Sequence, residues 1–214
     1  MFWVMREEFK EAYRKAKLIA DKLQQHPENL CEMIRTADII DAVEKHLDID
    51  IKFTTFDFSQ FSTAKKNRKG LSLETFGAAM CTEKDSDGKK HATILLNQKE
   101  NAEMQRFSLV HELGHLMMQD STNIDGYKIS THIDMDITSI PNEVLDKHEN
   151  AFLIEEQQAN IFALLVLLPY DALKKQLEIK DSIESVAKFF GVERSAIVSR
   201  MALGDEMRGV DSNE

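Results

Sequence analysis

The most informative stretch of this sequence is His111-Glu112-Leu113-Gly114-His115. Apolar residues surround it, so we expect a largely buried helix from about Ala102 to Gln119 that begins after Asn101. Residues i and i+4 share a helix face, so the two histidines can direct ring nitrogens at a single ion about 2.0–2.1 Å away. The spacing therefore predicts a zinc-binding helix.

Glu112 is offset from both histidines by helix geometry, which places its carboxylate beside the metal rather than on it. Zinc lowers the pKa of its water to about 7, and a carboxylate in this position can take the proton as hydroxide attacks a peptide carbonyl. The alternative is a chance pattern on an ordinary buried helix. We favour the catalytic interpretation, in which Glu112 is the general base of a metallopeptidase.

A catalytic zinc ion needs a third protein ligand, because such sites have three protein ligands and one open position. The metzincin pattern would require glycine at position 118 and histidine at position 121. The sequence has Met118 and Ser121 there, which excludes that subclass. The third ligand must come from elsewhere in the chain.

The best candidate is Glu156, within an apolar helix expected from roughly His148 to Leu168 and stopped by Pro169. Burying a carboxylate is costly unless a cation receives it. Asn160 lies one turn later on the same face and could orient a ligand histidine by accepting a hydrogen bond from its free ring nitrogen. For Glu155 we favour a solvated helix end, which also remains the alternative for Glu156.

The rest of the pattern predicts an α+β protein with a small, about three-stranded sheet. Expected helices cover residues 5–24, 30–47, 182–190 and 193–203, and expected strands cover 51–56, 71–80 and 91–96, with a turn at 85–88. Residues 120–146 are polar without a sustained period and are expected to form a long loop.

We divide the chain into three parts on this basis. Residues 1–50 form an N-terminal helical segment packed on the catalytic domain, residues 51–170 form that domain, and residues 171–214 form a C-terminal helical pair, with a flexible tail from about 205.

The net charge of −10 argues against nucleic acid as a partner, because phosphate backbones attract basic surfaces. The basic run at 65–69 is short and is interpreted as a solvated loop. Residues 1–5 are too short for a signal peptide, and no apolar stretch reaches membrane-spanning length. Cys31 and Cys81 are far apart and suggest reduced thiols. We expect a cytoplasmic protein that does not contact membranes.

The C-terminal pair raises a different possibility. Ala187, Gly191 and Ile197 occupy the packing, turn and core positions of a helix-turn-helix. The second helix offers only two basic residues, Arg194 and Arg200, in a chain of net charge −10. We prefer a pair of packing helices over a DNA-reading module, and contact with a protein partner stays open.

Residues 106–116 and the later segment from Glu156 to Pro169 resemble the ImmA/IrrE family of metallopeptidases. The resemblance is specific over about residues 90–170. It implies a zincin-like domain whose zinc ligands are His111, His115 and Glu156, with Glu112 as general base.

Characterised members of that family are intracellular regulators of prophages, mobile elements or stress responses, and several cleave or inactivate a helix-turn-helix repressor. The resemblance therefore implies a small repressor as the protein substrate. The alternative is a metal-stabilised regulator that binds a repressor or DNA without proteolysis. Tyr127, His132 and His148 are candidates for stabilising the oxyanion, although a surface position is the preferred interpretation for each. The sequence does not give the oligomeric state.

Overall fold

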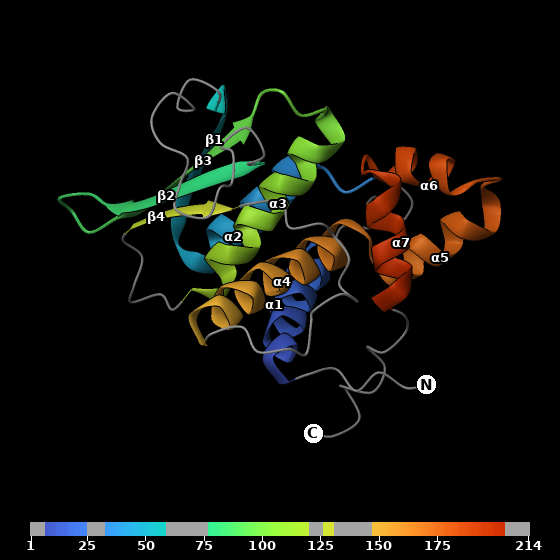
Figure 1. Ribbon diagram of the computed structural model, residues 1–214, viewed down its shortest axis with the longest axis horizontal. Coiled ribbons are helices and arrows are strands. Elements are labelled where there is room, and N and C mark those ends of the chain that lie inside the picture. Colours follow the sequence, from blue (N-terminus) through green and yellow to red (C-terminus); the bar gives the residue numbers. More distant parts are fainter. Residues whose placement is uncertain (1–6, 25–32, 59–76, 120–125, 131–146, 204–214) are drawn as a thin grey trace.

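A computed structural model of the chain describes residues 7–24, 33–58, 77–119, 126–130 and 147–203, which form an α+β fold (Figure 1). Its elements are α1 (Glu7–Gln24), α2 (Thr36–Leu47), β1 (Ile49–Phe56), β2 (Ala78–Lys84), β3 (Lys90–Asn97), α3 (Ala102–Met118), β4 (Gly126–Ser130), α4 (Lys147–Leu167), α5 (Tyr170–Ile179), α6 (Ile183–Phe190) and α7 (Arg194–Leu203). Among the described residues, no helix is both long and apolar enough to cross a membrane.

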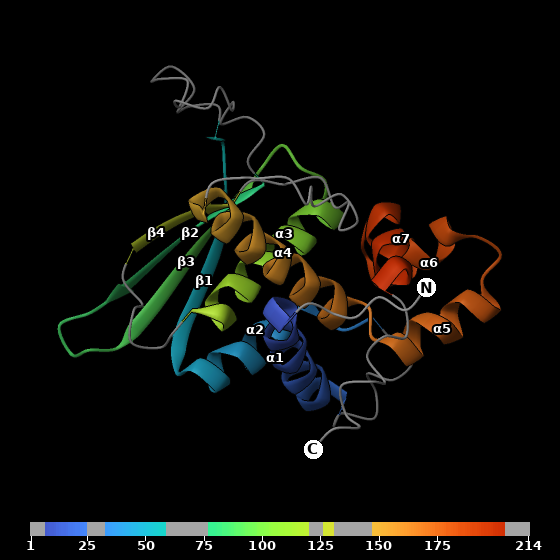
Figure 2. The ribbon, with the colours of Figure 1, turned by 60° about the horizontal axis from the view of Figure 1, so that its bottom comes forward.

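The four strands form one mixed sheet in the order β1-β3-β2-β4. β1 runs parallel to β3, whereas β2 is antiparallel to both β3 and β4. Alternate residues along β2 and β3 are buried, among them Met80, Ala92 and Ile94, as period-two side chains require when helices cover one face. Figure 2 shows the helices gathered on that side of the sheet.

The predicted strands are present, with two corrections. The second strand begins at Ala78 and continues to Lys84, so the prediction of 71–80 ended too early, and residues 71–76 lie outside the described residues. Residues 126–130, predicted as part of a loop, form edge strand β4 instead. β4 pairs with β2 in the register Ala79↔Ile129. The hydrogen-bonding edge of β2, rather than an apolar pattern within residues 126–130, therefore accounts for this strand.

The N-terminal helices pack onto α3 and α4, the two helices that carry the predicted metal ligands. α1 buries a stripe that includes Ala12, Ala16 and Ile19, as an amphipathic helix should, and it packs mainly against α4. α2 begins at Thr36, later than the predicted start near residue 30, because Arg35 has extended backbone dihedrals. α2 lies against α3 and β1.

The C-terminal region contains three helices where two were predicted. α5 was missed, because its ten residues follow Pro169 directly and carry only a short apolar stripe. α6 and α7 are joined at Gly191, whose φ of 61° is the left-handed value that ends many helices. Ala187 and Ile197 are buried between them, as the helix-turn-helix positions predict. The tail from about residue 205 lies outside the described residues.

Candidate metal centre

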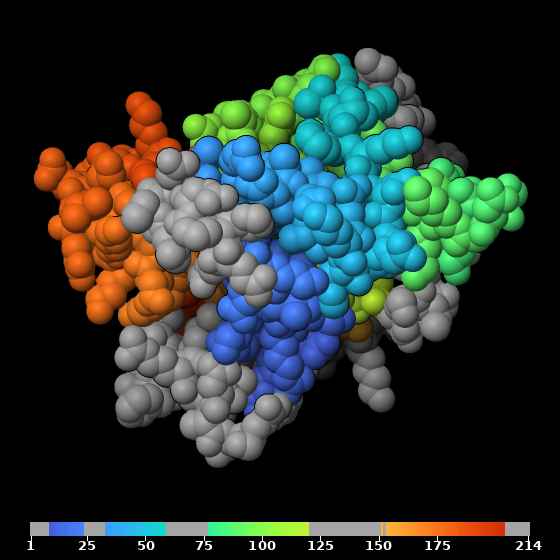
Figure 3. All heavy atoms as spheres, turned by 180° about the vertical axis from the view of Figure 1, so that it is seen from behind, coloured from blue at the N-terminus to red at the C-terminus, as the bar shows by residue number. Residues whose placement is uncertain are grey.

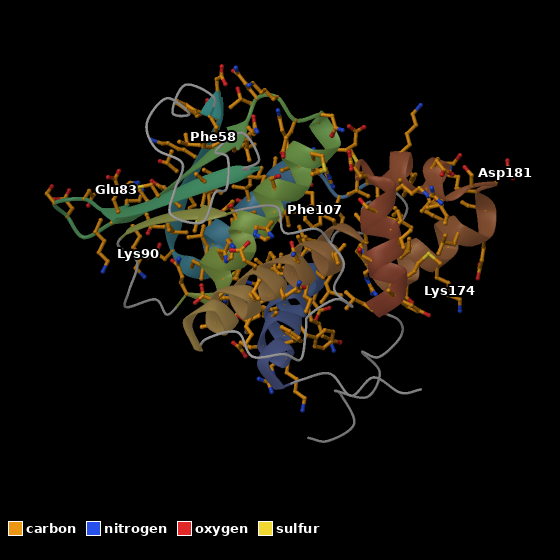
Figure 4. The ribbon with its side chains drawn as sticks, in the orientation of Figure 1. Phe58, Glu83, Lys90, Phe107, Lys174 and Asp181 are labelled. Carbon is orange, nitrogen blue, oxygen red and sulfur yellow. The ribbon has the colours of Figure 1, made fainter. Side chains whose placement is uncertain are left out.

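α3 carries the first half of the site. The Asn101 side chain accepts a hydrogen bond from the backbone N–H of Met104 at 2.8 Å and so caps the helix where the sequence predicted. Every residue from Phe107 to Met117 is buried, and Figure 4 marks Phe107 on this helix. The rings of His111 and His115 are 4.7 Å apart between centroids, with an interplanar angle of 86°. Both histidines therefore face the same side of one rigid element.

α4 carries the second half and approaches α3 very closely. A Cβ atom added to Gly114 would lie 3.0 Å from the Cα atom and 3.1 Å from the carbonyl oxygen of Ala159, and 3.2 Å from the Cβ of Phe162. A larger residue at this position would require α4 to shift by a few tenths of an ångström. Glycine in a helix costs about 1 kcal/mol relative to alanine, so its position inside the HExxH pattern was a usable signal for close packing that the sequence reasoning missed.

Glu156 projects from α4 between the two histidines. Its carboxylate oxygens lie 3.3 Å from Nε2 of His111 and 3.1 Å from Nε2 of His115. One atom from each of the three residues can be chosen so that all lie within 4.8 Å of one another. Glu156 is 1% exposed, whereas the neighbouring Glu155 is exposed, as expected for a solvated position. Of these two adjacent carboxylates, the buried one, Glu156, is therefore the one that faces the histidines.

Asn160 lies one turn beyond Glu156 and contacts the far side of the His111 ring. Its Oδ1 is 2.8 Å from Nδ1 of His111, and both residues are buried. Because an amide oxygen only accepts, Nδ1 must carry the hydrogen. In the neutral ring, Nε2 then keeps its lone pair on the side of Glu156 and His115, and this is the tautomer that a metal ligand needs.

The charges of the cluster are strongly coupled. Burial alone would raise the pKa of Glu156, but the adjacent His111 and His115 lower that pKa to about 2. Burial also opposes the charged form of His111, yet Glu156, followed by Glu112, raises the pKa of this histidine above its usual value. Two carboxylates and two imidazoles therefore lie together in buried positions, an arrangement that favours bound positive charge.

The unsatisfied atoms point to a metal ion. Within the described residues, Nε2 of His111 and both carboxylate oxygens of Glu156 are buried and lack a hydrogen-bond partner, although they lie close to one another. Such atoms are costly to bury unless something receives them. Two imidazoles and one carboxylate are one of the donor sets found in catalytic zinc sites. These residues therefore fit a metal ion.

Glu112 is fully buried on the adjacent face of α3, so the structure brings it next to the cluster as predicted from helix geometry. The oxyanion candidates are placed less completely. Tyr127 lies in β4 and pairs across the sheet with Cys81, but its side chain lies outside the description, as does that of His148 in α4. His132 lies outside the described residues altogether.

Comparison with known proteins gives one family. The model of the Peptidase M78 family, described as the IrrE N-terminal-like domain, matches residues 48–202, more than two thirds of the 214 residues. The match spans all four strands and the helices from α3 to α7, including every member of the cluster. No curated protein matches the chain significantly.

Proposed function

Because this chain belongs to the Peptidase M78 family, we propose that it is a zinc-dependent endopeptidase that acts in the cytoplasm and inactivates a small helix-turn-helix repressor by cleaving it. The family membership makes it a protein of the metallopeptidase type. The metal, the endopeptidase activity and the repressor substrate are the parts that we propose.

The observation that carries the proposal is the buried cluster of His111, His115 and Glu156, whose candidate ligand atoms lie within 4.8 Å of one another. A zinc ion held by these three residues would polarise a peptide carbonyl and lower the pKa of a water molecule. Glu112 would take the proton of the attacking water and pass it to the departing amine. Asn160 would keep His111 in the tautomer that leaves Nε2 available.

The test compares the purified wild-type protein with Glu112→Gln, using as substrate a small helix-turn-helix repressor encoded beside its gene. We expect both proteins to bind one zinc ion and only the wild type to cleave the repressor, because glutamine cannot accept the proton. The loss in kcat should be at least about a hundredfold, the lower range for general acid–base catalysis. Turnover that survives in Glu112→Gln would rule out the proposed base.

A second variant, Glu156→Ala, separates the ligand role from the catalytic role. It should lose zinc as well as activity, whereas Glu112→Gln should lose activity alone. The metallopeptidase proposal as a whole would be contradicted if the wild-type protein bound no zinc, either when purified with zinc present or when zinc is added back to the metal-free protein.

The DNA-binding alternative receives little support from the C-terminal helices. Arg200 is 1% exposed, and its Nε donates a hydrogen bond to the carbonyl oxygen of Leu168 at 3.1 Å, so it is not available to phosphate or bases. Arg194 is exposed but lies 3.3 Å from the carboxylate of Glu184. Of the two basic side chains of α7, one is therefore buried and the other is paired with a carboxylate at the surface, which gives α7 little free positive charge for a phosphate backbone.

A further inference from the structure

α1 lies outside residues 48–202, the part of the chain that matches the family, yet it packs against both helices that carry the candidate ligands, α3 and α4. Every residue of α4 from Ala159 to Leu167 has an exposure of 4% or less. A helix buried around its whole circumference needs a partner on each side. α3 covers one side of α4, and α1 covers another, as both ribbon views show (Figures 1 and 2).

Lys15 extends this packing from α4 to α3. Its side chain is 26% exposed, and its Nζ donates a hydrogen bond to the carbonyl oxygen of Met117. Met117 is in the last turn of α3, where carbonyl groups have no partner within the helix, and it follows His115 by two residues. A cation at a helix C-terminus is also favoured by the helix dipole.

α1 is therefore joined to both helices that carry the candidate ligands. It packs along α4, which bears Glu156, and holds the end of α3, which bears His115. Viewed from behind, α1 and α2 cover the middle of the molecule with one continuous surface (Figure 3). The separation of His115 from Glu156 depends on how α3 and α4 are held, and metal affinity is sensitive to such support.

We propose that α1 is a brace of the metal centre and that Lys15 is its positioning residue, acting through the carbonyl of Met117. The peptidase unit then includes α1, in addition to the residues that match the family. This inference rests on the proposed function in one respect, namely that the cluster holds a metal ion.

The chain offers a matched control one residue away. Arg14 and Lys15 both pair with Glu11, at 3.2 Å and 3.4 Å, but of the two it is Lys15 that donates a hydrogen bond to α3. Arg14→Met and Lys15→Met therefore each remove one positive charge and one ion pair with Glu11. Lys15→Met alone also removes the bond to Met117, and Lys15→Arg keeps a donor at that position.

The experiment measures zinc affinity of the full-length proteins by competition with a chromogenic chelator, and the visible spectrum of the cobalt-loaded proteins. We expect Lys15→Met to weaken zinc binding about tenfold, the lower end of the range for residues that support ligands, and to shift the cobalt spectrum. Arg14→Met should behave like the wild type, and Lys15→Arg should restore most of the affinity.

Hydrogen exchange of the metal-free proteins gives a second readout. Amides in the last turn of α3 should exchange faster in Lys15→Met than in Arg14→Met. Unchanged zinc affinity in Lys15→Met, or an equal loss in Arg14→Met, would overturn the proposal. If the wild type binds no zinc, the proposed function fails, and the exchange experiment then tests the role of α1 on its own. Faster exchange in the last turn of α3 in Lys15→Met would support that role, and unchanged exchange would overturn it.

Discussion

Asn160 determines which nitrogen of His111 is available. Its Oδ1 lies 2.8 Å from Nδ1 of that ring, in a site where both side chains are buried. Replacing it with leucine would leave a buried N–H group without an acceptor and would free the ring to rotate. We predict that Asn160→Leu weakens zinc binding by about ten- to a hundredfold. Asn160→Asp keeps an acceptor and should retain most of the affinity, as competition titrations would show; equal affinities in all three proteins would contradict an orienting role.

The charge state of His111 makes the effect of zinc depend on pH. Its folded pKa is raised above 6.5, so in the metal-free protein its pairing with Glu156 stabilises the fold below pH 6.5 and is lost as pH rises through the raised pKa. Glu156 stays ionised over this range, because its pKa is about 2. Zinc requires a neutral imidazole. We predict that the difference in Tm between zinc-loaded and metal-free protein widens as pH rises from 6.5; a constant difference would contradict this coupling.

The residues of the site differ in how far the sequence could predict them. His111, Glu112 and His115 lie in one helix, where spacing alone fixes their relative directions. The contact of Glu156 with them lies between two helices and depended on the argument that a carboxylate is costly to bury. The contact of Lys15 with Met117 also crosses between elements that are far apart in sequence, and no local pattern encodes it.

At the scale of elements, the crossing of α3 and α4 sets the geometry of the centre. Ala159 opposes Gly114 with backbone atoms, which cannot move aside as the end of a flexible side chain would. Gly114→Ala should gain about 1 kcal/mol in helix propensity. It should lose about 1–3 kcal/mol through overpacking, so the loss is expected to exceed the gain.

We therefore predict that Gly114→Ala lowers Tm and weakens zinc binding, because the ligand helices must separate by a few tenths of an ångström. Thermal unfolding with and without zinc, together with a competition titration, measures both effects. A variant that is more stable than the wild type and binds zinc equally well would show that this close approach is not needed.

The elements that the sequence did not predict are those that depend on distant partners. β4 has only five residues and lies in a polar stretch, so its composition gives no strand signal. It forms because its backbone pairs with β2. α5 is short and buries few side chains, among them Leu173. α3 and α4, by contrast, have long apolar segments and clear end signals at Asn101 and Pro169, and their positions were predicted closely.

At the scale of the whole molecule, one hydrophobic core joins the N-terminal helices, the sheet and the C-terminal helices. It runs from Phe9 in α1 to Ile197 in α7, with α4 packed against α1, α3 and α7. A core shared in this way favours a single cooperative unfolding transition. An ion that joins α3 to α4 would then stabilise every part that unfolds in that transition.

Metal removal tests this expectation. A ligand that binds only the folded state stabilises it by about 4 kcal/mol at a thousand times its Kd. A change of 1 kcal/mol shifts Tm by about 2–4 °C in a chain of this size, so we predict that a chelator lowers Tm by roughly 10 °C while unfolding stays a single transition. Glu156→Ala should show no such shift, because it lacks the third ligand. Calorimetry distinguishes the outcomes. A second transition whose temperature does not depend on zinc would show that the C-terminal helices unfold separately. A wild-type Tm that the chelator leaves unchanged would show that no ion links α3 to α4.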